Sequence, residues 1–174
     1  NKKHDLELRT SFDFQSERAY QVESLILEVS ELKKIIEKEL SKYRVKSLSG
    51  SIDHLVKSSV AVNGFKVVSS KVAASNADEL KSLGDTLRTK LGSGVGLLAA
   101  VIDDKVSLVC VVTDDLVASK RVEAGKVVGA VAKLVGGGGG GRPHMATAGG
   151  KDVSKLDEAL AKTKSIVESF LHQS

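Results

Sequence analysis

A run of six consecutive glycines in the last third of the chain is the feature most suited to chemistry. The residues are Gly136, Gly137, Gly138, Gly139, Gly140 and Gly141, and Arg142, Pro143 and His144 follow directly. Glycine loses more conformational freedom on ordering than any other residue, so such a run is either flexible or brings bare backbone close to a ligand. Clustered backbone N–H groups suit phosphate, and the Arg142 guanidinium matches phosphate oxygens. We therefore predict that this glycine-rich loop contacts phosphate or an RNA backbone, with His144 as a second candidate donor.

Basic side chains surround the glycine run. Residues 116–174 carry 9 basic and 5 acidic residues, so this segment holds all of the net charge of +4. An anionic partner is therefore expected, although any one lysine taken alone is best interpreted as a solvated side chain. A flexible linker is the alternative, but linkers do not usually end in a run of small, strand-compatible residues bounded by another glycine pair. The candidate RNA contacts are Lys120, Arg121, Lys126, Lys133 and Lys151.

Patterns typical of catalytic, metal and nucleotide sites are missing. No Gly-Lys-Ser/Thr triplet of a P-loop occurs, and the four histidines (His4, His54, His144 and His172) lack metal-ligand spacing. The acidic pairs Asp103-Asp104 and Asp114-Asp115 follow predicted strands, where turn chemistry explains them. We expect no catalytic residue, no bound metal and no cofactor in this chain.

A long helix is predicted to precede the region that holds the glycine run. Between about Ser16 and Lys46 there is no glycine or proline, and apolar residues recur at steps of three and four. The face that could pair with a second helix, and so form a homodimer, carries Val22, Leu25, Val29, Leu32 and Ile36. Residues 1–15 are interpreted as a tail or a strand, and Ser47–Asp53 as a hinge. Residues 1–50 are thus expected to form a helical subdomain, and 51–174 a globular domain.

The globular part is predicted to be mixed α/β, with a small sheet and packed helices. Asn63-Gly64 predicts a type I′ hairpin, and Asn76 with Glu79 predicts a helix start, for a helix that ends at Gly92. Gly94–Ile102 and Val106–Thr113 are predicted as buried antiparallel strands, with Cys110 an inert core thiol. One helix is expected over Leu116–Val135, softened at Gly125 and Gly129, and a last one from Ser154 to about His172. No apolar run reaches the ~20 residues of a membrane span.

The segment Val135–Gly150 (VGGGGGGRPHMATAGG) resembles the signature of the C-terminal domain of bacterial-type alanyl-tRNA synthetases, also called the DHH-associated domain. Asn63-Gly64-Phe65-Lys66-Val67, Leu87-Arg88, Lys105–Val109 and Gly125-Lys126 also lie where that family has them, so the resemblance covers roughly Ser47–Phe170. The sequence differs from the family pattern at His144, where many members carry an acidic residue.

The resemblance implies a non-catalytic module that contacts the outer corner of a tRNA. In the parent ligase that tRNA is specific for alanine. The module would assist aminoacylation and editing, which other domains of the parent perform. The first residue is Asn1, which suggests a piece of a longer chain. The expected compartment is the cytoplasm or an organelle with bacterial-type translation. Two alternatives stay open. One is a nucleotide-phosphate-binding domain of a DHH-family phosphoesterase, and the other is an assembly module that dimerises through the helix.

Overall fold

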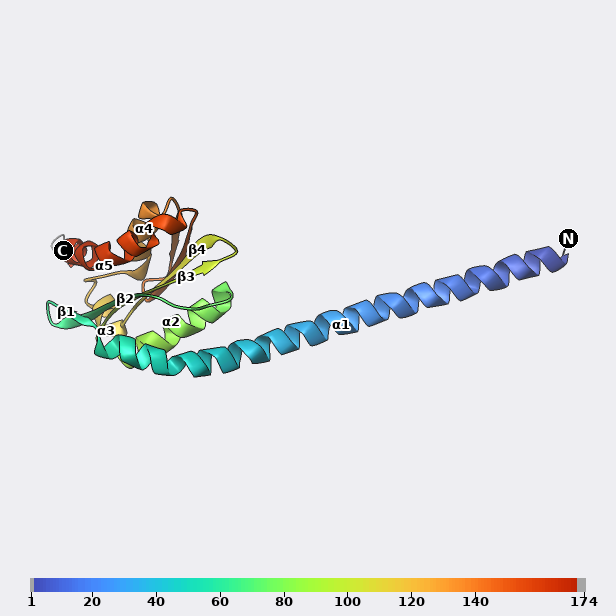
Figure 1. Ribbon diagram of the computed structural model, residues 1–174, viewed down its shortest axis with the longest axis horizontal. Helices are drawn as coiled ribbons and strands as arrows, with labels where there is room; N and C mark the ends of the chain where they lie inside the picture. Colours follow the sequence, from blue (N-terminus) through green and yellow to red (C-terminus); the bar gives the residue numbers. More distant parts are fainter. Residues whose placement is uncertain (1, 172–174) are drawn as a thin grey trace. The chain divides into compact units, whose positions relative to one another are not determined.

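The computed structural model describes residues 2–171, and it describes side chains in that range except those of 2–16, 45 and 47–49. The chain divides into two compact units, Asn1–Tyr43 and Arg44–Ser174 (Figure 1). Helix α1, Lys2–Lys57, forms all of the first unit that is described and the beginning of the second. The two compact units therefore meet between residues 43 and 44, and the division into domains 1–50 and 51–174 stays a prediction.

The second unit is built on a six-stranded mixed sheet of order β1-β2-β3-β4-β6-β5. Only β2 and β3 run parallel among the described strand pairs, because α2 crosses between them. The α/β fold class is confirmed. In chain order the elements after α1 are β1 Val60–Val62, β2 Phe65–Lys71, α2 Ala77–Leu91, β3 Gly94–Ile102, β4 Lys105–Val112, α3 Asp114–Ala118, α4 Ala124–Leu134, β5 Gly138–Gly141, β6 Met145–Gly150, the 3-10 turn η1 Val153–Lys155 and α5 Leu156–Leu171.

Two tight hairpins and one helix cap form where the sequence predicted them. Asn63 and Gly64 both have positive φ (46° and 90°) and join β1 to β2, as a type I′ turn requires. Asp103 and Asp104 likewise have positive φ between β3 and β4. The Asn76 side chain accepts a hydrogen bond from the Glu79 N–H at the start of α2.

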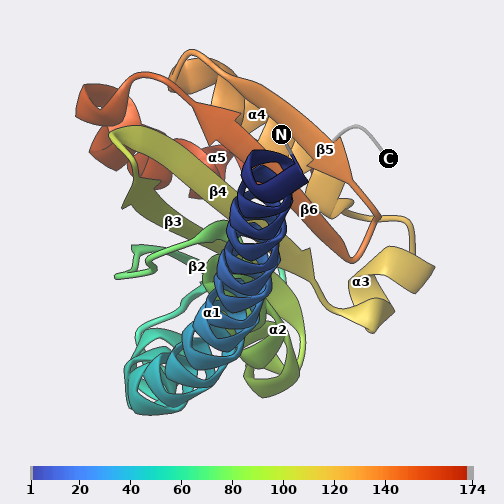
Figure 2. The same ribbon diagram turned by 90° about the vertical axis from the view of Figure 1, so that its right-hand side faces the viewer.

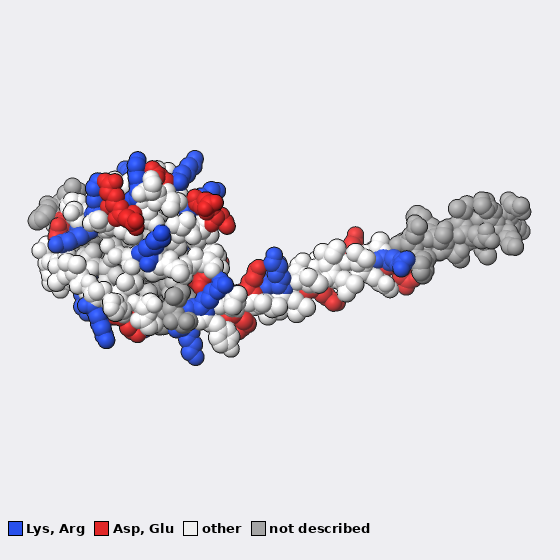
Figure 3. Space-filling model, in the orientation of Figure 1, with Lys and Arg blue, Asp and Glu red and all other residues white. Residues whose placement is uncertain are grey.

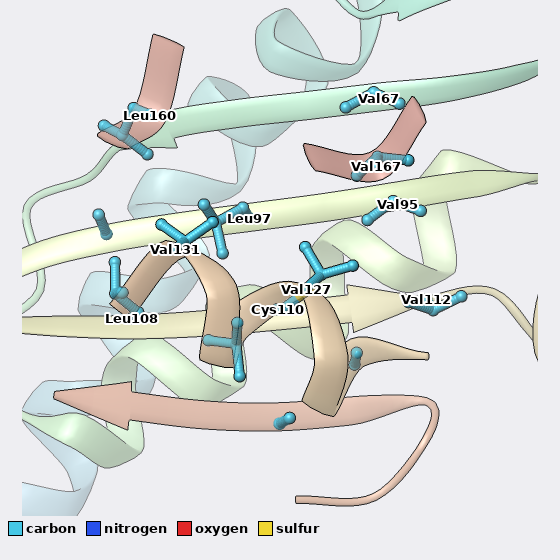
Figure 4. Close-up of a cluster of buried hydrophobic side chains, with 14 of the residues drawn as sticks. Val67, Val95, Leu97, Leu108, Cys110, Val112, Val127, Val131, Leu160 and Val167 are labelled. Atoms are coloured by element: carbon cyan, nitrogen blue, oxygen red, sulfur yellow. The ribbon is translucent and has the colours of Figure 1, made fainter. Parts of the chain in front are cut away.

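Helices cover both faces of the sheet, so β3 and β4 are buried on both sides (Figure 2). Helices α4 and α5 cover one face, where Leu97 and Cys110 meet Val127 and Val131 (Figure 4). Helix α2 and the end of α1 cover the other, with Ile52 of α1 only 1% exposed. Branched aliphatic side chains fill both layers, as a chain with 3% aromatic residues requires. Burial raises the pKa of the Cys110 thiol far above its usual range, which fits an inert core residue.

The extent of the long helix was predicted too short. Its backbone is helical from Lys2 to Lys57, so the expected tail or strand over 1–15 and the hinge over Ser47–Asp53 are both wrong. A glycine inside a helix costs roughly 1 kcal/mol relative to alanine. Burial of Ile52 against the sheet, two residues after Gly50, offsets that cost.

The prediction of a single helix over Leu116–Val135 is also wrong. The chain breaks between α3 and α4, where Lys120 has φ of 54°. The Lys120 N–H donates to the Val117 carbonyl and the Arg121 N–H to the Leu116 carbonyl, which is a Schellman end. Gly125 and Gly129 lie inside an unbroken α4.

The start of the last helix differs from the expectation in one residue. Asp152, and not Ser154, accepts the hydrogen bond that begins η1, because its carboxylate takes the Ser154 N–H at 3.1 Å. The α-helix itself begins at Leu156. Its predicted end at His172 lies outside the described residues.

Candidate nucleic-acid interface

The glycine run forms an edge strand rather than the predicted loop. Gly138–Gly141 is β5, at one margin of the sheet, antiparallel to β6. Gly136 (φ 64°) ends α4, because its N–H donates to the Lys133 carbonyl while the Gly137 N–H donates to that of Ala132. Only Gly136 and Gly137 therefore lie in the connection, and the rest of the run presents extended backbone.

Four of the six glycines are required by the fold itself. Gly136 has the left-handed φ that favours glycine. A Cβ on Gly137 would lie 1.8 Å from the Gly149 carbonyl oxygen, and one on Gly141 would lie 2.8 Å from the Ala146 Cα. A Cβ on Gly139 would lie 2.3 Å from the Thr147 carbonyl oxygen. These approaches leave no room for a side chain.

The remaining two glycines have no such reason to be glycine. Neither Gly138 nor Gly140 has a positive φ. A Cβ on either would meet nothing within 4 Å, and both residues are exposed. Glycine weakens a strand, and the fold does not require it at these two residues. They leave the outer surface of β5 without side chains.

Helix α4 lies alongside β5 through glycines of its own. A Cβ on Gly125 would be 3.5 Å from the Gly141 carbonyl oxygen, and one on Gly129 would be 3.7 Å from that of Gly139. The two glycines are one helical turn apart and face the same strand. These glycines let the backbones of α4 and β5, which lie side by side in Figure 2, approach each other closely.

The hairpin tip between β5 and β6 carries the predicted Arg142 and His144. Its backbone is held at two points: the Ala124 N–H donates to the Pro143 carbonyl at 2.8 Å, and the Val112 N–H donates to the His144 carbonyl at 3.0 Å. The Arg142 side chain is exposed and that of His144 is half-buried. A fixed backbone therefore presents an exposed guanidinium.

The predicted lysines flank the strand from both ends. Lys126 and Lys133 are seven residues apart on the exposed face of α4, about 10 Å along its axis. The Lys151 N–H donates to the Val135 carbonyl, which places Lys151 beside Gly136. Lys126 pairs with Glu123 at 3.2 Å, whereas no ion pair holds Lys133, Arg142 or Lys151 within the described residues.

Lys120 and Arg121 lie further from the strand, in the connection between α3 and α4. Both are exposed. On the face of the second unit visible in Figure 3, basic side chains are interspersed with acidic ones. The basic residues thus do not make one uniform patch there.

The helix face predicted to dimerise is solvent-exposed within the first unit. Its five residues are between 55% and 64% exposed: Val22, Leu25, Val29, Leu32 and Ile36. Figure 3 shows uncharged atoms between the charged side chains of this helix.

Groups suited to other chemistry are scarce among the described residues. No group of three or more His, Cys, Asp or Glu side chains there could hold a metal ion. Among residues 2–171, none of the helices combines the length and the hydropathy of a membrane span. A polar cavity at one end of the sheet, lined by Arg88, Ser93 and Asp115, was missed by the sequence analysis, because its residues come from two separate segments, 88–93 and 113–115.

Comparison with known proteins places this geometry in a family. The model of the DHHA1 domain matches residues 64–169. The chain is 45% identical over 156 residues to the alanine–tRNA ligase of Acetivibrio thermocellus, covering 90% of this chain and 17% of that protein. It is 42% identical over 150 residues to the alanine–tRNA ligase of Clostridioides difficile, covering 84% of this chain and 17% of that protein.

A solved structure shares the fold. The C-Ala domain of Aquifex aeolicus alanyl-tRNA synthetase superposes with a TM-score of 0.57 at 32% identity, covering 63% of this chain and 96% of that domain. The chain therefore matches nearly all of a C-Ala domain, but only about a sixth of the length of the curated ligases.

Proposed function

The chain belongs to the DHHA1 domain family, and on that premise we propose that it is the tRNA-binding C-terminal region of an alanine–tRNA ligase. In this proposal it contacts the outer corner of alanine-specific tRNA and performs no catalytic step itself. It assists aminoacylation and editing by the parent ligase, in a compartment where translation takes place. No cofactor is needed for this role.

The observation that carries the proposal is the bare outer surface of β5. Gly138 and Gly140 have no steric or conformational reason to lack a side chain, and they leave this surface open to the close approach of a partner. Structured RNA is recognised through its shape, its phosphates and its 2′-hydroxyls. A sugar–phosphate backbone can lie flush on a strand without side chains, where a methyl group would hold it away.

The charges beside the strand support the same partner. Lys133, Arg142 and Lys151 lie at the two ends of β5 without a described ion pair, and Lys126 lies on the neighbouring helix. Phosphate contacts position a protein on nucleic acid without reading sequence. The scarcity of aromatic side chains, 3% of the chain, fits contact with folded RNA better than stacking on single strands.

The test is the salt dependence of tRNA binding by the whole chain. Contact with about four phosphates would weaken binding roughly a hundredfold between 50 and 200 mM salt. An unlabelled tRNA competitor measures the affinity at each concentration. A flat response, or no binding at low salt, would contradict the proposal.

Self-association through α1 is a second function, and it is compatible with the first. The exposed residues Val22, Val29 and Ile36 alternate with Leu25 and Leu32 at steps of three and four. Branched residues at one heptad position and leucine at the other favour a two-stranded coiled coil. We infer that a second copy of this helix covers the row and makes a homodimer.

A further inference from the structure

One end of the sheet holds a polar groove that the function proposed above does not use. A cavity of about 540 Å³ lies between the end of α2, the start of β3 and the start of α3. Arg88, Thr89, Ser93, Thr113, Asp114 and Asp115 line it. These are hydrogen-bonding side chains of both charges, so the cavity suits a ligand with both donors and acceptors.

A second hollow extends this cavity. It measures about 280 Å³ and shares Ser93 and Asp115 with the first. It continues to Asn63 in the first hairpin and to Arg121 after α3. The two hollows adjoin at Asp115, which lines both, whereas Arg88 lines only the first and Arg121 only the second; together they are called the groove.

The groups in this groove are pre-arranged and only partly engaged. Arg88 donates from Nη1 to Asp114 at 3.0 Å, and its enclosed Nε has no acceptor among the described residues. The guanidinium therefore keeps an N–H donor for a ligand oxygen. The Ser93 hydroxyl donates to the exposed Asp115 carboxylate. That hydrogen bond is the main reason that the pKa of Asp115 lies below its usual range, and a hydrogen bond from Thr113 is the second. Asp115 is therefore an ionised acceptor at neutral pH.

The groove lies beside the candidate interface. The Val112 N–H donates to the His144 carbonyl, and the next residue, Thr113, lines the cavity. The hairpin tip that carries Arg142 therefore lies at the same end of the sheet as Thr113. An RNA strand that runs from β5 past this tip would reach the end of the sheet where the groove lies.

We propose that this groove holds one ribonucleotide unit of the bound RNA, with Asp115 accepting its 2′-hydroxyl and with Arg88 and Arg121 on the two flanking phosphates. A ribose in an RNA strand lies between two phosphates, which matches the order arginine, carboxylate, arginine. The 2′-hydroxyl is the donor that DNA lacks. A site built to bond a hydroxyl rejects an analogue without it. The inference rests on the proposed RNA binding and adds a means of selecting RNA over DNA.

The test compares affinities of the full chain for an RNA stem–loop and for the all-deoxy stem–loop of the same sequence. We expect wild-type protein to prefer the RNA, and Asp115→Ala to reduce that preference by about tenfold, as loss of a hydrogen bond to a charged group predicts. Asp157→Ala is the matched control, because it removes an exposed carboxylate on α5 and should leave the RNA/DNA ratio unchanged. Arg88→Ala and Arg121→Ala should weaken binding of both nucleic acids.

The outcomes separate the groove from the interface. If wild-type protein binds RNA with a steep salt dependence but Asp115→Ala keeps the full RNA/DNA ratio, the groove assignment is wrong and the proposed function stands. If wild-type protein binds neither nucleic acid, the proposed function fails first. Asp115→Asn repeats the measurement should the alanine variant unfold. Adenosine 5′-monophosphate is the last probe. If it binds in a way that depends on Asp115 but does not compete with the stem–loop, the groove is a site for a free nucleotide. That result would overturn the assignment of the groove to a unit of the RNA strand.

Discussion

A methyl group on Gly139 would lie 2.3 Å from the carbonyl oxygen of Thr147 on the neighbouring strand, whereas one on the next residue, Gly140, would meet nothing within 4 Å. Adjacent glycines in one strand therefore have different reasons to be glycine. This difference makes the roles of the run separable by experiment.

Gly139→Ala should destabilise the second unit, because the added carbon forces β5 away from β6. Overpacking of this kind costs about 1–3 kcal/mol, and for a chain of this size each kcal/mol lowers Tm by roughly 2–4 °C. Gly140→Ala should leave Tm within a degree or so of wild type. Thermal unfolding followed by circular dichroism compares the two variants, and equal Tm values would show that β5 does not approach β6 as described.

The double variant Gly138→Ala, Gly140→Ala should fold normally and bind tRNA more weakly. Its two methyl groups lie on the exposed surface where the RNA backbone is proposed to rest. We expect at least a tenfold rise in Kd, corresponding to about 1.4 kcal/mol. Filter binding of tRNA measures it, with Tm as the folding control. Unchanged affinity in the folded variant would remove the outer surface of β5 from the interface.

Arg142→Ala should weaken binding of all tRNA species alike, because its exposed guanidinium is proposed to contact phosphate and not bases. The slope of log K against log salt should fall by about 1. Arg142→Lys keeps the charge and should keep the slope. A variant that loses affinity for one tRNA only would indicate base recognition instead.

Leu25→Lys should dissociate the proposed dimer, because it places a charge in the apolar row of α1. Leu27→Lys is the matched control: it changes the same residue type on the same helix, two positions away, where the row does not pass. Sedimentation velocity of the full chain gives the oligomeric state. A wild-type monomer, or equal effects of the two variants, would contradict self-association through this row.

The Asp152 carboxylate should make stability pH-dependent. The Ser154 hydroxyl, and then the Lys155 charge, hold the pKa of Asp152 below its ordinary value of 3.8. Because the pKa is lower in the folded state, the carboxylate stabilises the fold at pH values above its unfolded-state pKa. That stabilisation is lost as the pH falls through the folded-state pKa. Wild type should thus exceed Asp152→Asn in urea midpoint at pH 7, and the difference should shrink below about pH 4. A constant difference down to acidic pH would exclude this carboxylate as the source.

Local patterns were sufficient to predict most of the second unit. The Asn63-Gly64 turn, the Asn76 cap and the buried strand Gly94–Ile102 each follow from a few neighbouring residues, since turn geometry, capping and hydrophobic runs are short-range properties. The predictions that failed were those in which a distant contact outweighs local preference. Ile52 packs against a sheet far along the chain and keeps Ser47–Asp53 helical, and the left-handed Lys120 divides a region whose composition favours one helix.

The sequence by itself determined the mixed α/β class, the long helix and the concentration of basic residues around a glycine run. It did not determine what the glycines do, because residue types and their spacing do not show which strands are neighbours in the sheet. Only the tertiary structure shows that Gly137, Gly139 and Gly141 lie against the backbone of β6, and that Gly138 and Gly140 face outward. The groove of Arg88, Asp115 and Arg121 is likewise invisible in the sequence, since packing of α2 and α3 at one end of the sheet brings together residues that are far apart along the chain.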